Sequence, residues 1–194
     1  MIRVFHGFLG SPEDFSFLRG EDVILHQLSD GVPETASRDI LIGYSMGGRL
    51  AMELARKNGF SRLVLINAHP GLEDAQREPR KVWEDEVLAR LQDHGEFLRW
   101  WNSLPLFAAD RPLETVPPRS AELFQRMRLS KQENFLPFLR SQNEKVHWIL
   151  GKDDPKYSEL ASSLDGFDVQ VIPGGHRLFQ HPDALHSAIK KALA

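Results

Sequence analysis

Three residue types that together activate a hydroxyl group stand far apart in this sequence, in the order serine, aspartate, histidine. Ser45 is the centre of a Gly43-x-Ser45-x-Gly47 pattern, Asp154 follows an apolar run, and His176 follows a pair of glycines. A serine hydroxyl is a poor nucleophile or base until an imidazole accepts its proton, and that imidazole needs a carboxylate to fix its tautomer. The three residues therefore predict a catalytic triad.

The residues around Ser45 predict the turn that presents its hydroxyl group. The stretch 40–42 is typical of a buried strand, and the stretch 50–55 has helical spacing of apolar side chains. A serine on a sharp turn between strand and helix is a nucleophile elbow, in which flanking glycines avoid steric collisions. The backbone N–H groups of Met46 and Phe8 are expected to form an oxyanion hole, because both lie in turns that follow strands.

The acid of the triad has two candidates. Asp153 and Asp154 both follow the apolar run that ends at Leu150, so either carboxylate could reach the histidine. We assign the role to Asp154 because it lies further into the turn. The other histidines show no metal-ligand spacing: His6 is expected to brace its own turn, and the rest, His69 among them, to be structural or exposed.

Short apolar runs alternate with helical patterns along the chain. Strands are predicted at 2–5, 23–25, 40–42, 63–66, 146–150 and 168–172, and helices after Ser11, after Ser45, at 157–164 and at 182–193. This alternation predicts an α/β fold, a mostly parallel sheet flanked by helices. Because the sites of such sheets lie at the carboxyl ends of the strands, the turns that carry the triad and Phe8 should meet there.

The segment from about 71 to 143 differs in character from the rest of the chain. It is charged, helical in period and rich in aromatic residues, and prolines such as Pro79 and Pro105 are predicted to break it into short helices. Strand patterns resume directly after it. We therefore predict one compact α/β domain over residues 1–194, with a helical cap insertion at about 71–143.

Composition narrows the function classes. With 41% hydrophobic and 26% charged residues among 194, the chain is typical of an ordinary globular protein. Its net charge of -3 argues against nucleic acid as a partner, and no apolar run reaches the roughly 20 residues of a membrane span. There is no cysteine and no signal-peptide pattern at the first strand. We expect a cytoplasmic enzyme without metal or other cofactor, acting on a small molecule.

Taken together, the motifs resemble the α/β-hydrolase superfamily and, more closely, the MenH family, the 2-succinyl-6-hydroxy-2,4-cyclohexadiene-1-carboxylate synthases of menaquinone biosynthesis. The segment 43–49 is similar to that family's elbow, with Tyr44 before the serine and Arg49 four residues after it. The stretch 69–72, His-Pro-Gly-Leu, is similar to the start of that family's cap. Further similar residues are Arg77, Arg80, Trp101, Arg128 with Asn134, and Lys156.

This resemblance implies a lyase that takes a proton from a substrate carbon, eliminates pyruvate and leaves a cyclohexadiene. Ser45, activated by His176, would act as the base, and the oxyanion hole would stabilise the developing enolate. Tyr44 and Trp101 would lie at the substrate. The carboxylates of a polycarboxylate substrate would be held by Arg49, Arg77, Arg80, Arg128 and Lys156, of which one or two are expected to be solvated bystanders.

The sequence leaves two other function classes open. A serine esterase or thioesterase would use the same triad through an acyl-serine intermediate, in an apolar rather than a cationic pocket. A binding module that only keeps the fold is disfavoured by the complete triad. The chain also departs from the MenH pattern: the family's D-x-P-G-H-G motif is replaced by residues 26–31, and only a short polar stretch, 29–39, precedes the elbow strand.

Overall fold

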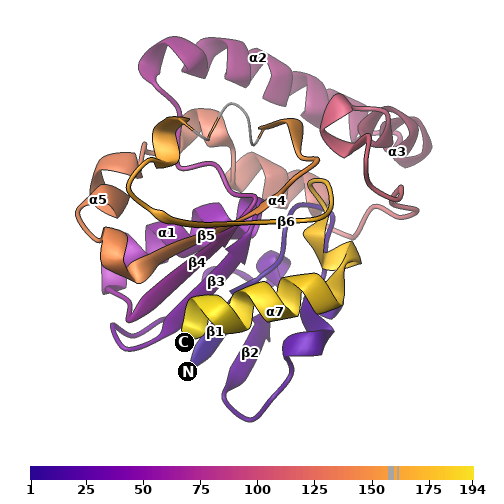
Figure 1. The fold of residues 1–194 in the computed structure, drawn as a ribbon. Coiled ribbons are helices and arrows are strands. Elements are labelled where there is room, and N and C mark those ends of the chain that lie inside the picture. The colour runs from indigo at the N-terminus through magenta and orange to yellow at the C-terminus, as the bar shows by residue number, and fades with distance from the viewer. Residues whose placement is uncertain (157–159, 161) are drawn as a thin grey trace.

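The computed structural model describes residues 1–156, 160 and 162–194. Its strands form one sheet in which every neighbouring pair is parallel, in the order β2-β1-β3-β4-β5-β6 (Figure 1). The predicted α/β class is confirmed, and the predicted strands differ from the observed ones only at their ends. The strands are β1 (Ile2–Phe5), β2 (Val23–His26), β3 (Ile40–Tyr44), β4 (Arg62–Ile66), β5 (Val146–Gly151) and β6 (Asp168–Ile172).

Successive side chains of a strand point to opposite faces of the sheet, and the central strands β3, β4 and β5 are buried on both faces. Leu63 and Leu65 belong to the apolar cluster that includes α1 (Met46–Asn58), whereas Val64 belongs to the cluster that includes α7 (Pro182–Leu193). In Figure 1 the yellow helix α7 lies in front of the sheet, opposite α1. Because all neighbouring strands are parallel, their carboxyl ends lie at the same edge of the sheet, between the helices that cover its two faces.

The chain between β4 and β5 forms the helical cap, defined here as residues 71–143, and the long helix α2 runs across the top of the molecule in Figure 1. None of the helices in the described part of the chain is long and apolar enough to cross a membrane. The cap contains α2 (Asp74–Arg90), α3 (His94–Asn102), η3 (Pro105–Phe107), α4 (Ser120–Arg126), η4 (Leu129–Lys131) and α5 (Leu136–Arg140), where η denotes a 3₁₀ helix.

The prediction that Pro79 breaks the cap into shorter helices is wrong, because α2 continues through it. Proline lacks the N–H that would bond to the carbonyl of Ala75, so the helix loses one hydrogen bond near its start. The second half of α2 is fixed by Glu84 and Val87, both completely buried. Pro105, in contrast, begins η3 as a proline at the first helical position does.

Two segments predicted as helices contain 3₁₀ helix in the structure. The helix predicted after Ser11 is the 3₁₀ helix η1 (Pro12–Leu18). Half of the residues in the helix predicted at 157–164 lie outside the described ones, and residues 162–164 form the 3₁₀ helix η6 (Ser162–Leu164). Any helix in the polar stretch 29–39 is expected to have one or two turns at most, and the structure has the 3₁₀ helix η2 (Leu28–Asp30) at its start and neither helix nor strand at 31–39.

Candidate active site

Ser45 occupies the turn between β3 and α1 with positive φ, 51°, and ψ of -113°. This conformation is strained for a residue with a side chain. Two glycines allow it: a Cβ atom on Gly43 would come within 2.5 Å of the Gly47 carbonyl oxygen, and one on Gly47 would collide with the carbonyls of Phe5 and His6. The glycines therefore let the elbow press against β1 and hold the serine hydroxyl above the sheet.

The structure brings the three predicted triad residues together. The Ser45 hydroxyl lies 3.0 Å from Nε2 of His176, and Nδ1 of His176 lies 2.6 Å from Oδ2 of Asp154. Asp154 and His176 are both buried, whereas Asp153 is exposed and points its backbone N–H at Gly174. In this geometry Asp154 accepts the Nδ1 hydrogen and leaves Nε2 to receive the serine proton.

Asn67, which sequence reasoning did not single out, fixes the loop of the histidine. Its amide nitrogen donates to the carbonyls of Gly175 and His176, at 3.1 and 2.8 Å, and its Oδ1 accepts from the N–H of Gly151 at 2.9 Å. The side chain thus joins the ends of β4 and β5 to the histidine loop. Its place directly after a predicted strand was the only signal that could have identified it.

The two residues predicted to supply the oxyanion hole, Met46 and Phe8, line the same cavity as Ser45. Met46 is the first residue of α1, so its N–H has no acceptor within the helix and lies at the positive end of the helix dipole. Phe8 follows β1 and, like Met46, lines the cavity at Ser45. His6 braces the Phe8 turn, as predicted: its Nδ1 donates to the Gly7 carbonyl at 2.7 Å, and burial lowers its pKa.

The cavity at Ser45 has an arm beneath the cap that is rich in aromatic side chains. The ring of Trp101 lies 5.4 Å from that of Phe107, which in turn lies 5.7 Å from the ring of His176. Tyr44 also lines this arm, with its ring 5.5 Å from that of His176. The aromatic lining consists of Phe8, Tyr44, Trp83, Trp101, Phe107, Phe124 and Phe179.

A second arm of the cavity, called the cationic arm here, begins at the same serine, and Arg49, Arg80 and Lys156 line both arms. Arg49 is only 7% exposed, and its Nη1 has no hydrogen-bond partner within the described residues. Burial, and next the charge of Arg80, lowers the pKa of Arg49 to about 9. Two guanidinium groups gathered in a buried space favour an anionic ligand, which would neutralise them.

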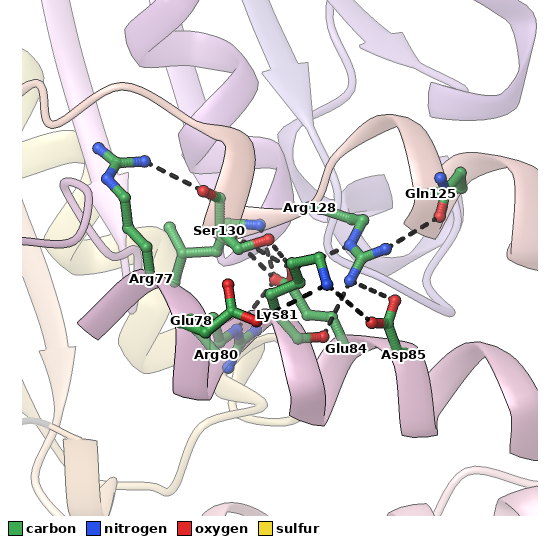
Figure 2. Close-up of polar contacts among 10 residues, drawn as sticks. Arg77, Glu78, Arg80, Lys81, Glu84, Asp85, Gln125, Arg128 and Ser130 are labelled. Carbon is green, nitrogen blue, oxygen red and sulfur yellow. Dashed lines mark hydrogen bonds and ion pairs between the residues drawn. The ribbon is translucent and has the colours of Figure 1, made fainter. Parts of the chain in front are cut away.

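The structure does not bring Arg77 and Arg128 to the lining of this cavity. Arg77 donates to the backbone carbonyl of Ser130 at 3.1 Å, and Arg128 forms ion pairs with Glu84 at 3.1 Å and Asp85 at 2.7 Å (Figure 2). Both guanidinium groups therefore join cap segments to one another. The substrate contacts predicted for Arg77 and Arg128 stay predictions. The contacts that the structure shows for both side chains are with other residues of the cap.

Glu84 is the centre of a buried ionic cluster that places Arg80 (Figure 2). Its side chain, 0% exposed, accepts from Nε of Arg80 at 2.9 Å, from the hydroxyl of Ser130 at 2.5 Å and from the N–H of Leu129 at 2.7 Å, and it pairs with Arg128. Burial alone would raise the pKa of Glu84, but these donors hold it below its usual value. The spacing of Arg80 and Glu84, one helical turn apart, could have indicated this pair.

Arg177, directly after the histidine, ties the cap to the histidine loop and was also missed. It is 2% exposed, and its guanidinium donates to the Arg111 carbonyl at 2.6 Å and to Oδ1 of Asn102 at 3.0 Å. The same group lies 4.1 Å above the ring of Phe107, which contacts His176. The end of α3 and the segment after η3 are thus held against the triad.

The fold, the elbow and the assembled Ser-His-Asp arrangement define an enzyme of the α/β-hydrolase type. Residues 5–188 match the alpha/beta hydrolase family, so the chain belongs to that family. The described residues contain no group of three or more His, Asp or Glu side chains placed to hold a metal ion.

Two relatives of the chain are named as one particular synthase. The chain is 29% identical over 171 residues to the 2-succinyl-6-hydroxy-2,4-cyclohexadiene-1-carboxylate synthase of Klebsiella pneumoniae subsp. pneumoniae, an alignment that covers 79% of this chain and 68% of the relative. It is 30% identical over 152 residues to the synthase of Escherichia coli O1:K1 / APEC, covering 70% and 60%.

Solved structures agree on the fold. MenH from S. aureus superimposes with a TM-score of 0.79 at 21% sequence identity, covering 100% of this chain and 93% of that one. A thermophilic esterase from Thermogutta terrifontis gives a TM-score of 0.59 at 16% identity, covering 99% and 88%. At these identities the two structures show a shared architecture rather than a shared activity.

Proposed function

We propose that the protein is a MenH-like carbon–oxygen lyase that releases pyruvate and forms 2-succinyl-6-hydroxy-2,4-cyclohexadiene-1-carboxylate. The observation that carries the proposal is the pairing, in one cavity, of the assembled Ser45–His176–Asp154 triad with the buried, partly unpaired Arg49. The names of the relatives supply the product, and the resemblance to the MenH family supplies the elimination of pyruvate. The substrate class is a small polycarboxylate.

The triad supplies the base. As Ser45 takes the proton from the substrate carbon, its own hydroxyl proton moves to Nε2 of His176, 3.0 Å away, and Asp154 stabilises the resulting imidazolium through Nδ1. The backbone donors of Met46 and Phe8 stabilise the enolate oxygen. The electrons of the enolate then form the new ring double bond as the bond between the ring carbon and the enolpyruvyl oxygen breaks. The leaving group departs as the enolate of pyruvate and takes the proton from Nε2 of His176, which gives pyruvate and restores the neutral imidazole.

The cationic arm selects the substrate. Arg49 and Arg80 present guanidinium groups beside Ser45, and such groups bind carboxylates through paired hydrogen bonds. Arg80 is kept in place from two sides, by Glu84 and by the ring of Trp83, which lies 4.3 Å beneath its guanidinium. A neutral ester gains nothing from these charges, so the arm favours a polycarboxylate over an ester.

The test compares two reactions of the same protein. Pyruvate release from the enolpyruvyl-bearing polycarboxylate is followed in wild type, Arg80→Ala and Arg128→Ala, beside hydrolysis of a small neutral ester. Loss of a charge-assisted contact of about 1.5–3 kcal/mol predicts a roughly ten- to hundredfold lower kcat/KM of Arg80→Ala for the polycarboxylate only. Arg128→Ala should show the same selectivity with a smaller loss, because it acts through Glu84.

The competing activity is an esterase that uses the aromatic arm as its acyl pocket. Brisk ester hydrolysis by the wild type without detectable pyruvate release would establish that activity and reject the lyase. Equal losses on both substrates would assign the arginines to cap stability alone.

A further inference from the structure

The cationic arm contains a histidine that the proposed mechanism does not use. His69 follows β4 and lines this arm together with Arg49, Arg80 and Lys156. Its Nδ1 accepts a hydrogen bond from the backbone N–H of Gly71 at 3.1 Å. Because a neutral imidazole whose Nδ1 is an acceptor carries its hydrogen on Nε2, the ring is left with an N–H donor.

The backbone around His69 fixes this tautomer. Gly71 has a φ of +136°, and a Cβ atom at this position would collide with the backbone of Asn134. The same turn is tied to the cap, since the N–H of Phe135 donates to the carbonyl of Pro70 at 2.8 Å. Glycine is therefore required to aim its N–H at His69, and the ring nitrogen that remains is set by the fold.

The surroundings keep His69 uncharged. Burial, and next the charges of Lys156 and Arg80, lower the pKa of His69 to about 3. Within the described part of the chain, Nε2 of His69 takes part in no hydrogen bond. A neutral donor among cations adds direction without the desolvation cost of a further charge. Such a donor suits an anion with several oxygens, each of which needs its own hydrogen bond.

We propose that His69 is a specificity-determining residue, whose Nε2–H donates to the substrate carboxylate that Arg49 and Arg80 neutralise and thereby orients it at Ser45. The inference rests on the proposed polycarboxylate-binding function and adds to it a neutral, tautomer-fixed recognition group. Charge from the arginines gives affinity, and the imidazole N–H discriminates between orientations of the bound carboxylate.

The test measures binding of phthalate, a cyclic dicarboxylate, by calorimetry to wild type, His69→Leu and His69→Gln. The leucine variant loses the donor and should bind phthalate about tenfold more weakly, whereas glutamine can offer an amide N–H and should restore most of the affinity. The matched control is His94→Leu, which makes the same change at an exposed histidine at the start of α3. It should bind like wild type.

Kinetics and NMR separate recognition from a purely structural role. His69→Leu should raise KM for the polycarboxylate more than it lowers kcat, and should spare hydrolysis of a neutral ester. In wild type with ¹⁵N-labelled histidine, His69 should be the Nε2–H tautomer, and its N–H proton should shift when phthalate is added. This second measurement decides the question even where the leucine variant does not fold.

Three results would overturn the inference: an Nδ1–H tautomer at His69, undiminished phthalate binding by His69→Leu, or no phthalate binding by the wild type. Failure of the proposed reaction is a separate outcome. If the wild type releases no pyruvate but still binds phthalate through His69, the lyase is wrong and the anion-recognition role stands.

Discussion

Glutamine in place of Glu84 tests whether the cap is held over the active site by a buried ionic cluster. The carboxylate is 0% exposed, and the side chain of Arg128 opposite it is 5% exposed. Every partner of Glu84 is a donor, so the amide nitrogen of glutamine faces donors and the charge that offsets two arginines is lost. Breaking a buried ion pair from one side costs about 3–5 kcal/mol.

Urea unfolding followed by tryptophan fluorescence measures this loss, because Trp83 adjoins the cluster and stacks against Arg80. The control is Glu86→Gln on the same helix. Glu86 pairs with Arg90 at the same helical spacing as Arg80 and Glu84, but these side chains are 47% and 43% exposed. An exposed pair is worth less than about 1 kcal/mol. Equal losses in the two variants would refute the claim that the buried cluster holds the cap.

The sign of the pH dependence gives a second readout of the same substitution. Because the folded-state pKa of Glu84 is lowered, its stabilisation is fully present above the unfolded-state pKa and disappears as pH falls through the folded-state value. With an unfolded value of about 4.3, wild type should lose stability steeply below about pH 4.5. The glutamine variant lacks this contribution and should be closer to wild type in acid than at pH 7.

Other substitutions test the remaining parts of the site. Ser45→Ala and His176→Ala should each lower turnover by about a thousandfold or more with the fold preserved, and the double variant should be scarcely worse, since the residues act as one unit; near-normal turnover of either would remove the triad. Arg49→Met should equal or exceed wild type in thermal stability while losing activity, because burying Arg49 beside Arg80 is costly; a fall in Tm would contradict this. Dialysis against EDTA should leave activity unchanged, and loss restored by a divalent ion would show a metal requirement.

The sequence predicted the parts of the molecule that depend on local patterns. Apolar runs gave the strands, and the glycines on either side of Ser45 indicated the elbow, because only that spacing lets α1 approach β1. Chain order and turn position were enough to place Asp154 and His176 beside it. Each of these features depends on a few neighbouring residues in the sequence, namely an apolar run, a pair of glycines or a turn directly after a strand.

The cap could not be predicted to the same depth, because its geometry depends on contacts between distant segments. Glu84 lies on a helix with several exposed acidic residues, and its sequence neighbourhood gives no sign that it alone among them is buried. Arg80 and Arg128 look equivalent in the sequence, yet one lines the cavity and the other does not. Which of the two arginines lines the cavity depends on how α2 packs against η4. This contact joins segments that are far apart in the sequence and share no local pattern.

The arrangement around Glu84 gives Arg128 an indirect part in substrate binding. Arg128 neutralises one side of the buried carboxylate while Arg80 takes the other, so the position of the cavity arginine depends on its more distant partner (Figure 2). Apolar residues of similar volume would often stabilise a buried site as well as such a cluster does. An ionic cluster is the arrangement that also presents a positive charge to the cavity beside Ser45. The free-energy cost of burying Glu84 and Arg128 is therefore accompanied by a functional gain, because the same cluster fixes the position of Arg80.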